Sequence, residues 1–216
     1  MLRAAVALVL ATALAGCAAT ATSPSSPSSA APAAVATFEA IELGGMGNDV
    51  ARVSIPDGAP AIVAFRHPDD APFTVDTLAG DGTGIGRLVE APGRYVGTVL
   101  LVEPAGGSVD ALRVTTTGTW SATIEPLSAA RGWDGVGKLD GTGDDVVRIE
   151  PPLIGVTPWH IEHKGSSAFV VVTYTVDGPT TVFDETGAGE GDIRVVGGTY
   201  LMTVRGDGAW AFYVLM

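Results

Sequence analysis

The sequence has a single cysteine, few aromatic residues and half as many basic as acidic side chains. Its one cysteine, Cys17, excludes an internal disulfide framework and a zinc site built on cysteines. Lys and Arg number 12 against 24 Asp and Glu, so the formal net charge is −12. A nucleic-acid partner requires a basic surface, and binding to anionic lipid requires basic patches. The charge balance therefore argues against both.

The sequence also lacks a convincing helical period. No window of about a dozen residues repeats apolar side chains every 3.6 positions. Short β-branched runs recur instead, separated by Gly, Pro and Asp, and this spacing is typical of a β-sandwich or barrel. With 46% hydrophobic residues, the chain is too apolar to be disordered throughout.

The N-terminus has the features of a targeting signal. Residues 1–16 contain a basic start at Arg3 and an apolar run from Ala4 to Leu14, too short to cross the ~30 Å hydrocarbon core but suited to a signal peptide. The segment Leu14-Ala15-Gly16-Cys17 resembles the lipobox of bacterial lipoproteins. This resemblance implies cleavage after Gly16, lipidation of Cys17 and attachment to the outer, extracytoplasmic face of the cell membrane. An ordinary secretory signal with an unrelated cysteine is the alternative.

Residues 17–36 continue from Cys17 with Ala, Ser, Thr and Pro almost alone. Such a composition buries too little apolar surface to order itself, so we expect a disordered linker. The linker would act as a spacer between the membrane and the folded part of the chain.

The remaining chain repeats itself. The segment LGGMGNDVARV at 43–53 matches LDGTGDDVVRI at 139–149, and the same offset pairs His67 with His163. Nearer the end, an offset of 90 pairs Trp120 with Trp210. We therefore predict an all-β chain with two tandem, jelly-roll-like antiparallel β-sandwiches at 37–127 and 128–216. A single larger β domain is the alternative.

Two further resemblances concern the repeats. Residues 144–151 and 197–204 resemble the opening and closing strands of bacterial pre-peptidase C-terminal domains. These are secreted β-sandwich accessory modules that often bind carbohydrate or protein. The GTGDDVVRI segment, the run from His163 to Phe169 and the segment from Asp207 to Trp210 are also similar to tandem repeats of uncharacterised actinobacterial surface lipoproteins. That second resemblance brings no activity with it.

Three groups of residues are candidates for chemistry. Asp140, Asp144 and Asp145 lie in a glycine-rich stretch and offer the hard oxygen ligands that Ca²⁺ prefers, although Asp and Gly also simply form turns. His160 and His163 lie three residues apart and point to opposite faces of a strand, which argues against a zinc site. The recurrence of His67 and His163 predicts the same side-chain hydrogen bond at the same strand end of each repeat.

The tryptophans divide into two pairs. Trp120 and Trp210 each come two residues after a Gly and open an alternating terminal strand, so we predict that both rings are core residues. Trp133 and Trp159 have no tryptophan counterpart in the first repeat. They are the better candidates for an aromatic surface that stacks on a sugar.

No catalytic motif stands out. The sequence contains no Gly-x-Ser-x-Gly elbow, and its Gly80–Gly86 string lacks the features of a phosphate-binding loop. We therefore expect no catalytic residues and no cofactor other than a calcium ion. The sequence favours a lipid-anchored, non-catalytic surface module that binds or spaces at the cell envelope. The alternatives are a glycan- or peptidoglycan-binding accessory module, a protein-binding module, and an envelope enzyme accessory or hydrolase without a recognisable motif.

The lipid anchor has a direct test. Replacing Cys17 by Ser removes the sulfur that would carry the diacylglycerol, so Cys17→Ser should leave an unprocessed precursor or release the chain into the medium. Metabolic labelling with a fatty-acid analogue measures this. Equal labelling of the wild type and of Cys17→Ser would show that Cys17 carries no lipid.

Overall fold

The computed structural model describes residues 37–56, 59–102 and 108–215. The predicted signal peptide and linker, residues 1–36, lie outside the described residues. Within the described ranges the chain forms strands and one short 3-10 turn, η1 (Leu127–Ala129), and no α-helix. These same residues include no helix that could cross a membrane. The predicted all-β fold is confirmed.

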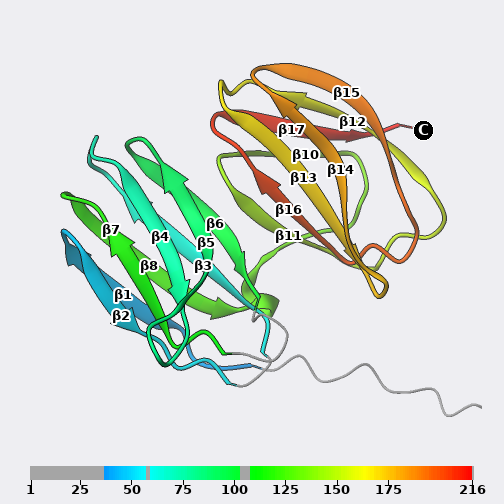
Figure 1. Ribbon diagram of the computed structural model, residues 1–216. Helices are drawn as coiled ribbons and strands as arrows, with labels where there is room; N and C mark the ends of the chain where they lie inside the picture. The colour runs from blue at the N-terminus through cyan, green and yellow to red at the C-terminus, as the bar shows by residue number, and fades with distance from the viewer. Residues whose placement is uncertain (1–36, 57–58, 103–107, 216) are drawn as a thin grey trace, which may run out of the picture. The chain divides into compact units, whose positions relative to one another are not determined.

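The first repeat is a sandwich of two four-stranded antiparallel sheets (Figure 1). The strand orders are β1-β8-β3-β6 and β2-β7-β4-β5, the jelly-roll arrangement predicted from the sequence. The strands span Ile41–Met46 (β1), Asp49–Arg52 (β2), Ala61–His67 (β3), Phe73–Leu78 (β4), Gly84–Ala91 (β5), Tyr95–Leu101 (β6), Ala111–Thr115 (β7) and Thr119–Pro126 (β8).

The second repeat has the same topology with one added strand. Its sheets are ordered β10-β17-β12-β15 and β14-β13-β16-β11-β9. Eight of these strands therefore correspond one for one to β1–β8, and β9 is the addition. The strands span Arg131–Trp133 (β9), Lys138–Thr142 (β10), Asp145–Ile149 (β11), Thr157–His163 (β12), Ala168–Thr175 (β13), Gly178–Thr186 (β14), Gly189–Val195 (β15), Leu201–Arg205 (β16) and Ala209–Val214 (β17).

The added strand β9 pairs parallel with β11, whereas every other strand pair described is antiparallel. It comes from the connection between the repeats. Sequence reasoning had no strand here, because a three-residue stretch with a central Gly132 carries almost no period-2 signal. It also missed β10, where Asp140 and Gly141 suggested a loop.

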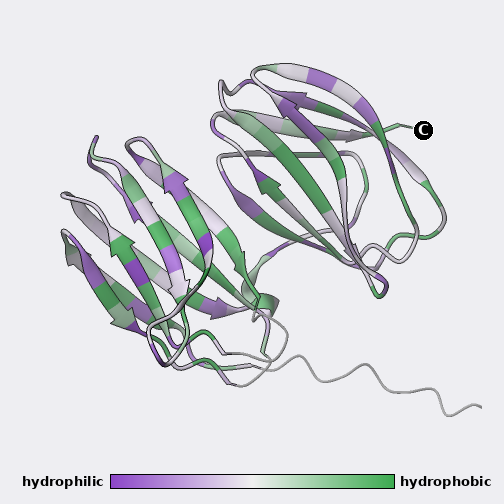
Figure 2. Cartoon of the chain, viewed as in Figure 1, coloured by the Kyte–Doolittle hydropathy of each residue, from purple (hydrophilic) through white to green (hydrophobic). Residues whose placement is uncertain are grey.

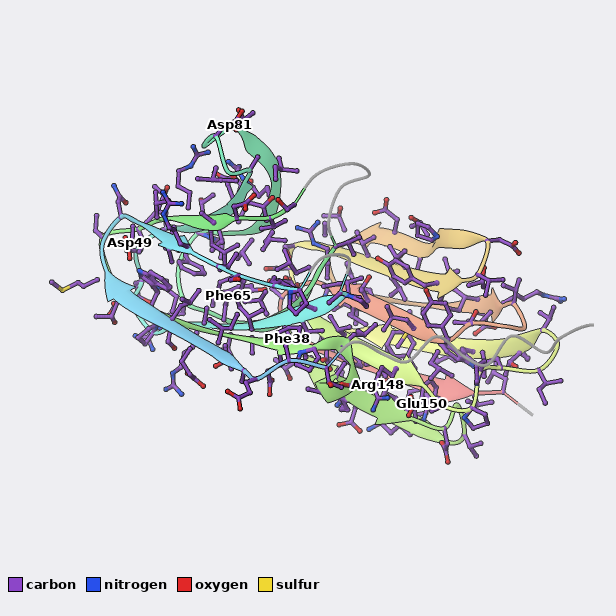
Figure 3. All side chains as sticks on the ribbon, turned by 90° about the horizontal axis from the view of Figure 1, so that it is seen from below. Phe38, Asp49, Phe65, Asp81, Arg148 and Glu150 are labelled. Carbon is purple, nitrogen blue, oxygen red and sulfur yellow. The ribbon has the colours of Figure 1, made fainter. Side chains whose placement is uncertain are left out.

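Each sandwich encloses its own core because alternate residues of a strand point to opposite faces of a sheet. In β12, for example, Trp159, Ile161 and His163 are buried, whereas the residues between them are partly exposed. Figure 2 shows hydrophobic and hydrophilic colours alternating along the strands, and Figure 3 shows Phe65 among the side chains of the first sandwich. One buried cluster contains only residues from Val53 to Ile124, and a second only residues from Trp133 to Phe212. A smaller third cluster, which includes Ile62 and Leu201, draws on both repeats.

Trp120 and Trp210 are buried, as predicted. Each ring packs on a glycine directly opposite it on the neighbouring strand, Gly45 for Trp120 and Gly141 for Trp210. A Cβ added to Gly141 would lie 2.3 Å from the Trp210 ring, so only glycine leaves the ring its space. The Nε1 of Trp210 also donates a 2.8 Å hydrogen bond to the Gly143 carbonyl. Among the described residues the Nε1 of Trp120 has no such acceptor.

Truncation of either ring tests its role in the core. We expect Trp120→Ala and Trp210→Ala each to lower the free energy of unfolding by about 3–5 kcal/mol, because a large buried ring leaves a cavity. Urea unfolding followed by circular dichroism measures the change. The exposed Val50 supplies a control, since Val50→Ala should shift stability by no more than about 0.5 kcal/mol. Wild-type midpoints for the tryptophan variants would contradict the assignment.

Candidate functional site

The structure places Trp133 and Trp159 in the core of the second sandwich. Trp159 is fully buried and Trp133 nearly so, with their ring centroids 4.9 Å apart. Trp159 also meets Phe212 edge to face, and Trp133 donates from Nε1 to the Val136 carbonyl at 3.0 Å. A ring without an exposed face cannot stack on a sugar. The prediction of a binding surface at these two residues is therefore corrected: Trp133 lies on β9, the strand that the first repeat lacks, and its ring packs in the core against Trp159.

The three carboxylates of the calcium prediction do not converge. Asp140 lies on β10, 3.3 Å from the ammonium of Lys138. Asp144 accepts hydrogen bonds from the Tyr95 hydroxyl at 2.7 Å and from the Gly206 amide at 2.8 Å.

Asp145 has partners of its own. It pairs with Arg131 at 2.8 Å and accepts from the Val146 amide. Burial raises the pKa of Asp145, and the charge of Arg131 opposes that shift. Within the described ranges no three His, Cys, Asp or Glu side chains are grouped to hold a metal ion. Calcium needs 6–8 oxygens around one point, so this geometry does not support the calcium hypothesis.

His67 and His163 both lie against backbone carbonyls, but those carbonyls belong to different positions of the two repeats, so the prediction of the same hydrogen bond is wrong. The ring nitrogens of His67 lie 2.7 Å from the Thr119 carbonyl oxygen and 2.9 Å from that of Ala71. Those of His163 lie 3.1 Å from the Gly187 carbonyl oxygen and 2.6 Å from that of Asp207. Both imidazoles are buried, and each stacks on a phenylalanine. Each histidine therefore ties loops together at one end of its sandwich.

One group of side chains in the second repeat resembles a catalytic triad in composition. It consists of Ser166, Ser167, His163 and Asp207. Both seryl hydroxyls donate to the Asp207 carboxylate, at 2.7 and 2.6 Å, and both serine amides do the same. These hydrogen bonds, led by that of the Ser167 hydroxyl, hold the pKa of Asp207 well below its usual value. A nucleophilic serine would have to donate to the imidazole. Here the imidazole meets a backbone carbonyl, so the group is a loop tie.

A hollow of about 260 Å³ lies on the outer face of the sheet β10-β17-β12-β15. Its floor contains small residues on adjacent strands: Gly141, Ala209 and Ala211. Charged and polar side chains of both signs border it: Lys138, Asp140, Thr142, Glu162, Lys164 and Tyr213. The hollow therefore offers hydrogen-bond donors and acceptors beside a flat apolar floor.

Two aromatic residues line this hollow, the buried Trp210 and the more exposed Tyr213. The Tyr213 ring is half-buried, with the Lys138 ammonium 5.7 Å from its centroid. Its hydroxyl donates to the Glu162 carboxylate at 3.4 Å. Sequence reasoning missed Tyr213, although alternation after Trp210 and Phe212 places it on the outer face of β17. The companions on β10 and β12 required the strand order, which the sequence does not contain.

The first repeat carries different residues at the same positions. Glu42 is opposite Thr123 across β1 and β8, just as Lys138 is opposite Tyr213 across β10 and β17. The Tyr213 ring and the Lys138 ammonium thus belong to the second repeat alone.

His160 extends this charged face next to Tyr213. Its Nδ1 lies 2.7 Å from the Asp192 carboxylate on the neighbouring strand β15. This hydrogen bond is the main cause of a raised pKa at His160, above the ordinary 6.5. The charges of Asp192, Glu190 and Glu162 act in the same direction.

Comparison with known proteins gives little further information. No family model and no curated protein matches the chain. Among solved structures, it is similar to the turret protein A223 of Sulfolobus turreted icosahedral virus, at 16% identity and a TM-score of 0.26 over 84% of this chain and 100% of that one. A protein kinase A regulatory subunit from Trypanosoma brucei gives 11% identity and a TM-score of 0.22 over 81% and 74%. At such TM-scores these likenesses carry no argument.

The pairing of His160 with Asp192 has a pH signature. Because the folded-state pKa is raised, the pair stabilises the protein below the ordinary pKa, and this stabilisation is lost as pH rises through the folded value. Asp192→Asn should lower the pKa of His160 towards 6.5, measured by NMR titration of the imidazole. Asp177→Asn, in the β13–β14 turn, serves as the control. An unchanged His160 titration in Asp192→Asn would refute the pairing.

Proposed function

We propose that this chain is a lipid-anchored, extracytoplasmic, non-catalytic surface module. The lipobox-like Leu14–Cys17 segment supports the anchor, because the only cysteine of the chain occupies the position that the motif requires. The Ala-, Ser- and Pro-rich linker that follows supports a folded part held away from the membrane. Two stable sandwiches with tightly tied loops suit binding or spacing at the cell envelope.

The geometry of the polar clusters supports a non-catalytic role. Asp207 and its serines satisfy one another, and both buried histidines are directed at backbone carbonyls. An enzyme needs a nucleophile or a base that is free to meet a substrate in a cleft. The hollow on the second sandwich holds carboxylates and ammonium groups, but no hydroxyl–imidazole pair borders it.

Saccharide binding is the form of this role that one observation favours: the hollow that contains Tyr213. Sugars combine an apolar C–H face with a ring of hydroxyls. The Tyr213 ring and the floor of Gly and Ala can pack against the C–H face. The carboxylates of Asp140 and Glu162 and the lysine ammonium groups can hydrogen-bond the hydroxyls. The hollow is smaller than the ~300–1,000 Å³ of sites for drug-sized ligands. It therefore suits a short stretch of a longer envelope glycan.

Two other roles remain as alternatives, and each predicts a different experimental result. A purely structural spacer would bind no glycan and would tolerate any change in the hollow. An accessory of an envelope enzyme would bind that enzyme, and its loss would be seen in the partner's activity.

Tyr213→Thr gives the second repeat the residue that the first repeat has at the matching position. We expect it to weaken glycan binding by about three- to tenfold, since an aromatic packing contact contributes ~0.5–1.5 kcal/mol. A glycan array selects the ligand, and isothermal titration calorimetry compares the variants. Thr123→Ala, at the matched position of the first repeat, should bind like the wild type. Equal affinity for Tyr213→Thr would remove the hollow from the proposal, and no binding on the array would favour the spacer.

A further inference from the structure

One end of the second sandwich exposes aliphatic side chains on adjoining loops. Ile154 and Val156, between β11 and β12, are 94% and 60% exposed. Val196, between β15 and β16, is 47% exposed, and Val136, between β9 and β10, is 68% exposed. We call these four residues the apolar tip. Figure 2 shows hydrophobic colour on the loop from β11 to β12.

The loops of the apolar tip are bound to one another. The Leu153 amide donates to the Thr199 carbonyl at 3.1 Å, and the Gly198 amide donates to the Leu153 carbonyl at 2.8 Å. The backbones touch as well, since a Cβ on Gly197 would lie 2.7 Å from the Gly155 nitrogen. The Leu153 side chain packs on the core beneath. The exposed side chains are therefore presented from paired backbone, which lowers the cost of moving them out of water.

The two longer loops carry few charges: Glu150, which pairs with Arg148, is the only charged residue in either of them. Residues 151–159 and 195–204 contain no Asp, Glu, Lys or Arg, in a chain with 17% charged residues. The corresponding stretches of the first repeat contain Asp57 and Glu103. The β9–β10 loop does carry a charge, Asp134, whose carboxylate accepts from the Val136 amide, so the uncharged part of the tip is Ile154, Val156 and Val196.

We propose that the apolar tip inserts into the interfacial layer of a lipid bilayer. The inference rests on the proposed lipid anchor. Residues 18–37 would tether the sandwiches to the bilayer, and 20 residues reach at most ~70 Å. A surface held this close has a high effective concentration, so a few aliphatic side chains suffice where they would fail in free solution. Because the chain has a net charge of −12, insertion depends on apolar contact and favours neutral over anionic lipid.

A fluorescent probe at the tip tests the inference in the full, lipidated chain. Ile154→Cys is labelled with an environment-sensitive dye. Cys17 is the only natural cysteine and its sulfur would be blocked by lipid, so the new thiol is the only one labelled. Met46→Cys, 78% exposed on the first sandwich, is the matched control. Both variants are reconstituted in phosphatidylcholine vesicles with and without spin-labelled phosphatidylcholine.

We expect the probe at residue 154 to shift its emission to the blue and to be quenched about twofold or more, as for a group ~5–10 Å inside the interface. The probe at residue 46 should show neither effect. A second variant, Ile154→Asp with the dye on Val196→Cys, should lose the quenching. Ile154 is 94% exposed, so a carboxylate there leaves the core unchanged.

The outcomes separate the inference from the anchor on which it rests. A chain that floats with the vesicles while the probe at 154 is not quenched has its anchor and lacks the insertion. A blue shift without quenching indicates that a second copy or another protein covers the tip, which also overturns the inference. If fatty-acid labelling and flotation both fail, the anchor is wrong. The inference then falls with it, because an untethered tip of a few aliphatic side chains is too small to hold a bilayer.

Discussion

Each sandwich depends on a tryptophan that lies on a glycine of the strand beside it. Trp120 over Gly45 joins β1 to β8, and Trp210 over Gly141 joins β10 to β17. The ring fills the core on one side, while the missing side chain on the other lets the two backbones keep their pairing. Each pair joins residues that are far apart along its repeat, and a side chain at the glycine would crowd or collide with the ring at this register.

The fold followed from the sequence because its signals are local or repeated. Alternation and the recurrence of Gly, Pro and Trp are visible in one dimension, and they led to two jelly rolls and to the buried Trp120 and Trp210. The candidate site did not follow, because it depends on which strands are neighbours. Trp159 is conspicuous alone, yet it shares a face with Ile161 and His163 and lies in the core. Tyr213 is inconspicuous alone and acquires its surroundings only from β10 and β12.

The two repeats keep one loop tie while exchanging the residues that make it. In the first, Asp69 after β3 accepts from the Thr119 amide and hydroxyl at the start of β8. In the second, Asp207 before β17 accepts from Ser166 and Ser167 after β12. In the first repeat the carboxylate lies on the loop after β3, and in the second it lies on the loop before β17. The hydroxyl donors lie on the opposite segment in each case. The hydrogen bonds next to the buried histidine are therefore the constrained feature, and the outer faces of the sheets are free to differ.

The parallel strand β9 affects how the two repeats can be separated. It pairs with β11, a strand whose counterpart in the first repeat, β2, is left at the edge of its sheet. An unpaired edge invites another chain to add a strand, and β2 limits this by its shortness and by the charges of Asp49 and Arg52. The second repeat takes its protection from the connection between the repeats. If the repeats were separated by a cut after Trp133, β9 would stay with the first repeat and β11 would become an unpaired edge strand. A cut before Arg131 would keep β9 paired with β11.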